Sequence, residues 1–166
     1  EVSKFSGSDK LLNQLSKDEL TLSTMLSVDA RDDAPRVGEI RATLANIMAK
    51  HMGINRSESS LNTAAEQLTE LSGRAAEMRL DYRDSLLMNQ NLVENISMRS
   101  MLTIAQAAVT AALQRQESRG THSREDFVGR DDETFLKHSL VGADGASDWL
   151  PLRKSIRGSW LLAPDS

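Results

Sequence analysis

Residues 61–78 read LNTAAEQLTELSGRAAEM, and this stretch decides the fold. Its apolar and small residues recur in alternating steps of three and four, which places them on one face of a helix. A face with this spacing packs against neighbouring helices. Ser57 or Ser59 can supply the N-cap, so the helix is predicted to run from there to about Tyr82. The packing face comprises Leu61, Ala64, Leu68, Leu71, Ala75, Met78 and Tyr82.

Two further helical patterns flank this one. Residues 36–52 follow Pro35 and end before Gly53, which are start and stop signals. Residues 85–117 form the third pattern, and its alanine-rich segment AQAAVTAAL (105–113) admits close approach by a neighbour. Short connections between the helices predict an antiparallel three-helix bundle of the spectrin-repeat kind over 36–118. The apolar face of the 36–52 helix comprises Ile40, Leu44, Ile47, Met48 and Met52. The apolar face of the 85–117 helix comprises Leu92, Ile96, Leu102, Ala105, Val109 and Ala112.

The two ends of the chain are predicted to differ from this bundle. Residues 1–35 indicate a linker with a weak helical segment, marked by Leu11, Leu15, Leu22, Met25 and Leu26. Residues 119–166 contain glycines and prolines without a sustained apolar stripe, which predicts an irregular, extended docking tail. Ordering such a tail costs about 1 to 2 kcal/mol per residue, so it needs a surface to lie on. Its apolar anchors are Trp149, Trp160, Leu161 and Leu162.

Composition narrows the possible classes of protein. The 166 residues suit one domain, and 39% apolar residues with only 4% aromatics favour an all-α fold. A net charge of −4 argues against a nucleic-acid partner. The absence of cysteine excludes disulfides and thiolate chemistry, and no uninterrupted apolar run reaches the roughly 20 residues of a membrane span. Because the chain begins at Glu1 without a signal-like segment, we expect it to be a piece of a longer protein.

The sequence offers little catalytic chemistry. Neither a dinucleotide-binding G-x-G-x-x-G motif nor a P-loop occurs, which excludes binding of FAD, NAD or ATP by those routes. His51, His122 and His138 lack the i, i+4 spacing that places two imidazoles on one helical face for zinc. No catalytic, cofactor-binding or metal-ligating residue is therefore predicted.

The charged stretch RQESRGTHSREDF (115–127) remains to be explained. Its charges are costly to bury unless each has a partner, and the forked guanidiniums of Arg119 and Arg124 suit an interface that fixes register. Docking onto another surface, a solvated loop, and a small active site of Arg119, His122 and Asp126 are the three interpretations. If both arginines face an absent domain, replacing them should change stability by no more than about 0.5 kcal/mol.

The same residues resemble a known family. LQRQESRGTHSREDF (113–127) and GRDDETFLKHSL (129–140) are similar to the C-terminal region of the flavoprotein subunit of succinate dehydrogenases and fumarate reductases. L-aspartate oxidases share the E-S-R-G-x-H run, but the R-D-D and F-L-K-H continuation favours the succinate and fumarate branch. Thr121 and Val128 depart from the family pattern, which often has alanine and proline there.

The resemblance implies the C-terminal helical domain of an FAD-dependent oxidoreductase that interconverts succinate and fumarate. This domain would pack against the flavin-binding domain of the same protein and support subunit assembly. FAD would bind in the parent protein, whose flavin and substrate motifs precede this region, so the isolated chain is predicted to be inactive and to hold no cofactor. An iron–sulfur subunit of a membrane complex is a further candidate partner, with a cytoplasmic location peripheral to the membrane.

The expected docking interface follows from the same motifs. It comprises Glu117, Ser118, Arg119, Gly120, His122, Arg124, Asp126, Arg130, Asp131 and Asp132. Two alternatives stay open, a stand-alone helical protein-interaction module and the same domain from an L-aspartate oxidase-like flavoenzyme.

Overall fold

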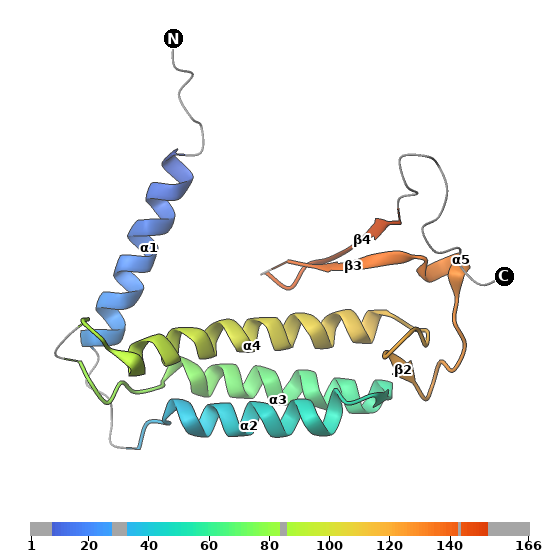
Figure 1. Ribbon diagram of the computed structural model, residues 1–166, viewed down its shortest axis with the longest axis horizontal. Coiled ribbons are helices and arrows are strands. Elements are labelled where there is room, and N and C mark those ends of the chain that lie inside the picture. The colour runs from blue at the N-terminus through green and yellow to red at the C-terminus, as the bar shows by residue number, and fades with distance from the viewer. Residues whose placement is uncertain (1–7, 28–32, 84–85, 143, 153–166) are drawn as a thin grey trace, which may run out of the picture.

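The computed structural model describes residues 8–27, 33–83, 86–142 and 144–152 (Figure 1). The predicted helical fold is confirmed, because most of the described residues lie in helices. The helices are α1 (Ser8–Ser27), α2 (Val37–His51), α3 (Glu58–Ala76), α4 (Gln90–Gln114) and α5 (Asp132–Phe135). The strands are β1 (Asn55–Arg56), β2 (Ser123–Arg124), β3 (Lys137–Val141) and β4 (Ser147–Pro151).

Helices α2, α3 and α4 lie side by side and share one hydrophobic core (Figure 1). Ile40 of α2, Leu68 of α3 and Met98 of α4 are all fully buried in it. Burying a side chain of this size stabilises a fold by roughly 1.5 to 3 kcal/mol. The predicted stripes supply most of this core, with Ile96 as an exception, since it is 41% exposed.

Helix α3 begins where the sequence predicted and ends earlier. The Ser57 hydroxyl accepts a hydrogen bond from the backbone N–H of Ser60 at 3.3 Å, which makes Ser57 the N-cap. The helix stops at Ala76, and Tyr82 is 74% exposed, so the predicted extension to Tyr82 is wrong. Met78 is nevertheless buried, because the chain beyond α3 still lies against the core.

Helix α4 begins at Gln90 rather than near residue 85. The Asn89 side chain caps it by accepting from Leu92 N–H at 2.9 Å. Asn89 also donates through Nδ2 to the Tyr82 carbonyl at 2.9 Å, which ties the connection to the helix start. Both bonds favour a loop before Gln90, and the apolar period alone does not reveal them.

Helix α1 lies apart from the shared core (Figure 1). Leu11, Leu12, Leu15 and Leu20 are 59–69% exposed, whereas Leu22, Met25 and Leu26 are half-buried. The apolar face of α1 is therefore more exposed toward its N-terminal end than toward its C-terminal end.

The expectation of an irregular tail after residue 118 is wrong for several segments. Strand β2 pairs in parallel with β1, and β3 pairs antiparallel with β4. Trp149 of β4 packs against the Phe135 ring, with ring centroids 5.6 Å apart, and Phe135 is buried. Up to residue 152 the tail thus has pairing partners within the chain, β1 for β2 and β4 for β3. Trp160, Leu161 and Leu162 lie outside the described residues.

Helix α4 is apolar on more than its core-facing side. Its length and composition alone would allow it to cross a membrane, although no uninterrupted apolar run in the sequence indicated this. Core helices of globular proteins can share this length and composition, and α4 buries Met98, Leu102 and Val109 in the core that it shares with α2 and α3. Only 28% of its most apolar window is buried, and Ile104 is 68% exposed.

Candidate functional site

The charged stretch leaves the C-terminal end of α4 and turns back toward the start of α3. Arg119 and His122 pair through both backbone hydrogen bonds, Arg119 N–H to His122 O at 2.8 Å and the reverse at 3.1 Å. Gly120 occupies the first central position of this tight turn with φ of +59°, a conformation that glycine adopts at no steric cost. Beyond the turn, β2 pairs with β1 and aligns Arg124 with Arg56.

Glu117 is the centre of one charge cluster, and its side chain is fully buried. It accepts from Arg115 Nη1 at 2.5 Å and from Arg119 through Nε at 2.8 Å and Nη2 at 2.9 Å. The backbone N–H of Asp131 adds a bond at 2.9 Å. Burial by itself raises the pKa of Glu117, but the hydrogen bonds from Arg119, Asp131 and Arg115 outweigh it and hold this pKa below its ordinary value. The carboxylate is therefore ionised and structural.

Asp132 extends the Glu117 cluster toward the surface. It accepts from Arg119 Nη2 at 2.5 Å and from Arg130 through Nε at 2.9 Å and Nη2 at 2.6 Å. Hydrogen bonds from Arg130 and then Arg119 lower the pKa of Asp132 well below its usual range. Together with Arg115, these residues form an alternating row of cations and anions, which we call the Glu117 cluster.

Arg115 connects this cluster to the β3–β4 hairpin. Its guanidinium donates to the carbonyls of Phe135, at 2.9 Å, and Lys137, and to the Ser139 hydroxyl at 3.2 Å. It also lies over the Trp149 ring, 5.3 Å from the centroid, in a cation–π contact. The end of α4 is thereby joined to the hairpin through one side chain.

Arg124 is the centre of a second cluster and is 1% exposed. It donates to both oxygens of Asp126, from Nε at 2.7 Å and from Nη2 at 2.8 Å, in the paired geometry that suits a carboxylate best. Its Nη1 donates to the carbonyl of Ala112 at 2.9 Å, in the last turn of α4. A cation there is favourable because the carbonyls at a helix C-terminus lack intrahelical partners.

Asp126 joins the same cluster to the other helix end. Its Oδ2 accepts from the backbone N–H of Glu58 at 2.8 Å, at the start of α3. The bonds from Arg124, followed by the one from Glu58, lower the pKa of Asp126 far below its ordinary value. One Arg–Asp pair thus caps the C-terminus of α4 and the N-terminus of α3 together.

His122 completes the Arg124 cluster. Its Nδ1 lies 2.8 Å from Arg56 Nη1 and its Nε2 lies 3.0 Å from the Arg115 carbonyl. Because arginine can only donate and a carbonyl can only accept, the ring is neutral with its proton on Nε2. Burial is the main reason that the pKa of His122 is lowered, and the neighbouring charges of Arg56, Arg124 and Arg115 lower it further, against the opposing effect of the bond to the carbonyl.

These contacts correct the expected partners of the arginines. Arg119 and Arg124 both pair with carboxylates within the chain, so the expectation that they pair with groups of an absent domain is wrong. The predicted set divides by exposure: Glu117 and Arg124 are buried, whereas Gly120, Asp126 and Arg130 are exposed. Ser118 has a structural role, since its hydroxyl donates to the Phe127 carbonyl at 2.8 Å and accepts from Arg124 N–H at 2.8 Å.

The sequence did not identify three residues that contribute to the two charge clusters. Arg115 lies in the quoted stretch but was not assigned to the interface, and Arg56 contacts His122 from 66 residues away. Glu58 contributes only its backbone. Strands as short as β1 and β2 carry no periodic signal, so nothing in the pattern indicated that residues 55–56 and 123–124 meet.

The geometry does not favour a small active site of Arg119, His122 and Asp126. Each side chain is engaged in a different set of bonds, and both ring nitrogens of His122 are occupied. A hollow of about 350 Å³ lies beside Arg115, Arg119 and Lys137, but its guanidiniums are already paired. Within the ranges that the structure describes, no group of three or more His, Asp or Glu could hold a metal ion.

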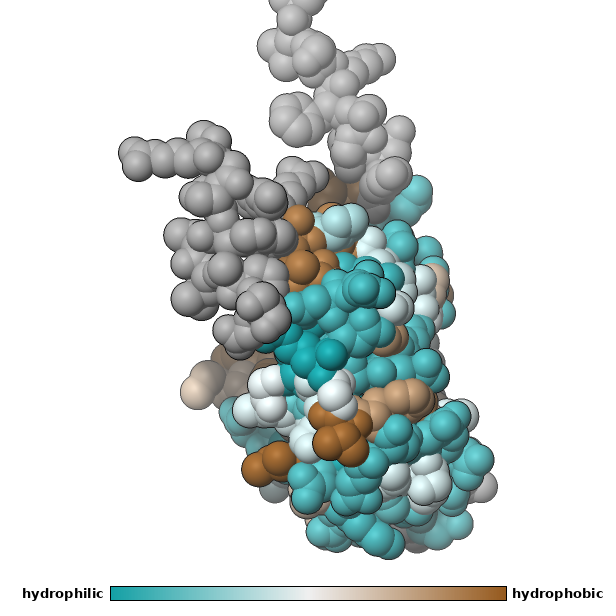
Figure 2. Space-filling view, turned by 90° about the vertical axis from the view of Figure 1, so that its right-hand side faces the viewer, coloured by the Kyte–Doolittle hydropathy of each residue, from teal (hydrophilic) through white to brown (hydrophobic). Residues whose placement is uncertain are grey.

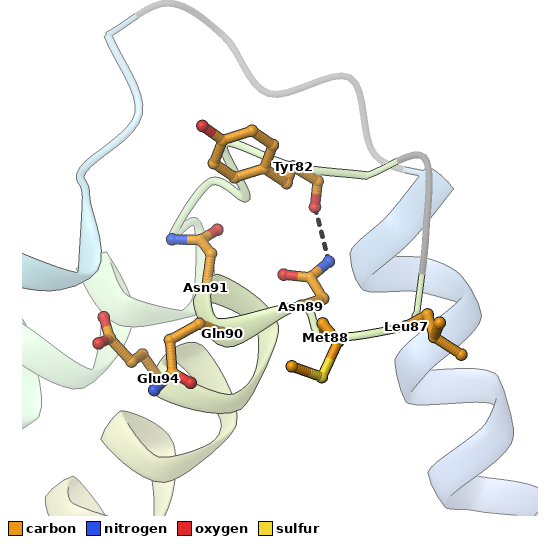
Figure 3. Close-up of a pocket in the computed structure, with 7 residues that line it drawn as sticks. All are labelled: Tyr82, Leu87, Met88, Asn89, Gln90, Asn91 and Glu94. Carbon is orange, nitrogen blue, oxygen red and sulfur yellow. Dashed lines mark hydrogen bonds between the residues drawn. The ribbon is translucent and has the colours of Figure 1, made fainter.

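The two ends of the helical body differ in character. The end that carries the Glu117 and Arg124 clusters is mostly hydrophilic, with small separate apolar areas (Figure 2). At the start of α4, a second hollow of about 480 Å³ is lined by Tyr82, Leu87, Met88 and polar neighbours (Figure 3). None of the predicted interface residues lines it, and Met88 is 95% exposed.

Comparison with known proteins places this helical domain in a family. Residues 41–154 match the family described as fumarate reductase flavoprotein C-term, and the chain belongs to it. This confirms the resemblance drawn from residues 113–140. More specifically, the chain is the C-terminal domain of a flavoprotein subunit of the succinate dehydrogenase and fumarate reductase family, and the two alternatives are not favoured.

Individual relatives agree with this placement. The chain is 39% identical over 106 residues to the fumarate reductase flavoprotein subunit of Mycobacterium tuberculosis, covering 64% of this chain and 18% of the relative. It is 32% identical over 110 residues to the succinate dehydrogenase flavoprotein subunit of Rickettsia bellii, covering 66% and 18%. A solved structure of Escherichia coli quinol fumarate reductase matches with a TM-score of 0.80 at 25% identity, over 99% of this chain and 28% of that chain. The chain thus spans about a fifth of the length of these curated relatives.

Proposed function

We propose that this domain is a rigid, non-catalytic support that packs against the flavin-binding part of a succinate- or fumarate-converting flavoprotein. The observation that carries the proposal is the family match over residues 41–154 together with charge clusters whose groups are all committed to structural bonds. In this role α2, α3 and α4 form an antiparallel three-helix bundle over residues 36–118, followed by a docking segment over 119–166.

FAD belongs to the relatives, which are named as flavoproteins. The residues of this chain do not fit the cofactor, because the guanidiniums that could hold a pyrophosphate are paired with Glu117, Asp126 and Asp132. The described parallel pairing is also limited to the two-residue strands β1 and β2, without a glycine-rich turn. We therefore assign FAD binding and electron transfer to the remainder of such a flavoprotein.

The docking interface is proposed to use the exposed side of residues 117–132. Four of its residues are at least partly exposed, namely Arg119, Gly120, Arg130 and Asp132. The buried side chains of Glu117 and Arg124 fix the conformation of this segment through their ion pairs and hydrogen bonds. A surface preorganised in this way loses little conformational entropy on binding. An iron–sulfur subunit and a cytoplasmic position peripheral to a membrane follow as parts of the same proposal, since relatives include a quinol fumarate reductase.

A chimera tests this function. The matching C-terminal part of the Mycobacterium tuberculosis relative is replaced by this chain, and dye-coupled fumarate reduction and bound flavin are measured. We expect both to be retained. In the same chimera, Arg130→Glu should lower flavin retention, whereas Glu133→Arg, an exposed charge change outside the two clusters, serves as the control. An inactive chimera whose domain is folded would contradict the proposed support role.

A further inference from the structure

His122 connects the charged turn to the segment between α2 and α3. Its Nδ1 accepts from Arg56 Nη1 at 2.8 Å, and its Nε2 donates to the Arg115 carbonyl at 3.0 Å. The ring therefore bridges β1 and the residue that caps the C-terminus of α4. A backbone bond runs beside this bridge, from the Glu125 N–H to the Arg56 carbonyl at 2.8 Å. Of the groups in the bridge, the imidazole is the one whose charge changes near neutral pH.

The charged groups that face the ring are cations from each neighbouring element, namely Arg56 from β1, Arg124 from β2 and Arg115 from the end of α4. Arg124 pairs with Asp126, and Arg115 pairs with Glu117. The charges of these two arginines are therefore balanced by carboxylates beside them. Both ring nitrogens are already bonded, and neither of them contacts a carboxylate.

Arg56 differs from the other two arginines because its partners are neutral. Its Nε donates to the Gly53 carbonyl at 2.7 Å, and its Nη1 donates to the ring. Within the described ranges no carboxylate pairs with this guanidinium. A proton on Nδ1 of His122 would turn the acceptor into a donor and place two like charges 2.8 Å apart. The Arg56–His122 bond can therefore form only while the ring is neutral.

We propose that His122 is a pH-sensitive switch, whose protonation breaks the Arg56–His122 bond and releases β1 from β2 while α2, α3 and α4 stay packed. The core that these helices share consists of apolar side chains, which do not respond to pH. Glu117 and Asp126 also stay ionised in mild acid, because hydrogen bonds from arginines hold the pKa of each carboxylate below its ordinary value. Protonation of the ring is thus confined in its effect to the contact with β1.

The pH range of the switch follows from the pKa of the ring in its two states. Burial and then the charges of the three arginines lower the pKa of His122 in the closed state, whereas a released ring has an ordinary pKa of about 6.5. The closed state is therefore fully favoured above about pH 6.5 and loses stability as the pH falls toward the lower pKa of the closed ring. At about pH 5 the population of the open state can rise by up to about 30-fold, because the released ring is then protonated in about that excess.

The released residues 119–124 belong to the proposed docking interface. Acidification should therefore loosen that interface in the longer protein, a consequence that rests on the proposed function. The switch itself rests only on contacts within this chain, so it is tested without a partner.

Amide hydrogen exchange of the full chain, followed by NMR, tests the switch. The probe is the Glu125 N–H, which is bonded across the β1–β2 pair to the Arg56 carbonyl. Its protection factor, which corrects for the intrinsic pH dependence of exchange, should fall by about fivefold to 30-fold between about pH 7 and 5. The Phe135 N–H, bonded to the Asp131 carbonyl at 2.9 Å, is the control amide and should keep its protection. Circular dichroism verifies that the helices remain.

Two substitutions separate the switch from a merely structural role of the ring. His122→Gln keeps a side-chain acceptor that does not titrate, so the protection of Glu125 should no longer depend on pH. Arg56→Gln keeps the ring and removes the opposing charge, and its amide oxygen can accept from a protonated ring, so the fall should shrink to less than about twofold. His138→Gln replaces the exposed histidine of β3 and is the matched control, which should leave the fall unchanged.

His51 is the remaining histidine, and it bonds the Ser60 hydroxyl at 3.0 Å in the first turn of α3. A pH dependence that persists in His122→Gln and disappears in His51→Gln overturns the proposal. So does a protection factor of Glu125 that stays constant between about pH 7 and 5. An equal fall at Phe135 overturns it as well, because the whole domain would then open rather than the β1–β2 contact alone.

Discussion

Neutralising Glu117 should destabilise the domain strongly. In Glu117→Gln the shape is kept, but the charge that Arg115 and Arg119 contact at 2.5 and 2.8 Å is removed from a fully buried position. Removing one partner of a buried ion pair typically costs about 3 to 5 kcal/mol. The arginine side chains are 14% and 29% exposed, and Arg119 keeps Asp132, so hydration and the second pair reduce the loss to about 2 to 4 kcal/mol.

Urea unfolding followed by circular dichroism measures this loss directly. The midpoint should fall at an unchanged m-value, and the melting temperature should drop by roughly 2 to 4 °C for each kcal/mol. Glu125→Gln is the control, because it removes the same charge from an exposed neighbour and should cost less than about 0.5 kcal/mol. If Glu117→Gln behaved like this control, the cluster would contribute nothing to stability and the argument would be refuted.

Three further outcomes are expected. Arg124→Met should lower the free energy of unfolding by about 2 to 4 kcal/mol, because Asp126 and the carbonyls at the end of α4 lose their donor. A loss below about 0.5 kcal/mol in urea unfolding would contradict this. Because the pKa of His122 is lowered in the fold, the contribution of His122 to stability is present above the unfolded pKa of about 6.5 and is lost as the pH falls toward the folded pKa. His122→Gln should therefore flatten the dependence of the unfolding free energy on pH between about pH 7 and 5. An unchanged slope would argue against a buried neutral ring. Gly120→Ala should cost about 1 kcal/mol by thermal melting, because φ is +59°, and no loss would mean that the turn relaxes.

The helical body could be predicted from sequence because its signal is periodic. The face from Leu61 to Ala75 and the Ser57 cap were confirmed, since burial and capping both follow from local spacing. The helix ends were less predictable. Asn89 bonds the Tyr82 carbonyl across the connection, a contact that moves the start of α4 without changing the apolar pattern.

The charged segment was located correctly from the sequence, but the partners of its side chains were not predicted. The resemblance singled out residues 113–140, but composition could not show whether Arg124 pairs within the chain or beyond it. Arg124 pairs with Asp126, and the backbone N–H of Glu58 at the start of α3 holds the same carboxylate across a sequence separation of 68 residues, which no local pattern reveals. The β3–β4 hairpin was missed because the half-buried positions of β3 are Lys137, Ser139 and Val141, which give no apolar alternation in the sequence, and Trp149 is the only half-buried residue of β4.

The turn at Gly120 and the hydrogen bonds of Ser118 also affect how easily proteases cleave this loop. Exposed loop tips are the preferred sites of proteolytic cleavage and of tolerated insertions. Here the backbone N–H groups of Ser118, Arg119 and His122 are all bonded within the chain, as is that of Glu125. Digestion should therefore spare this loop, and an inserted residue would separate the two helix ends that Arg124 and Asp126 hold together.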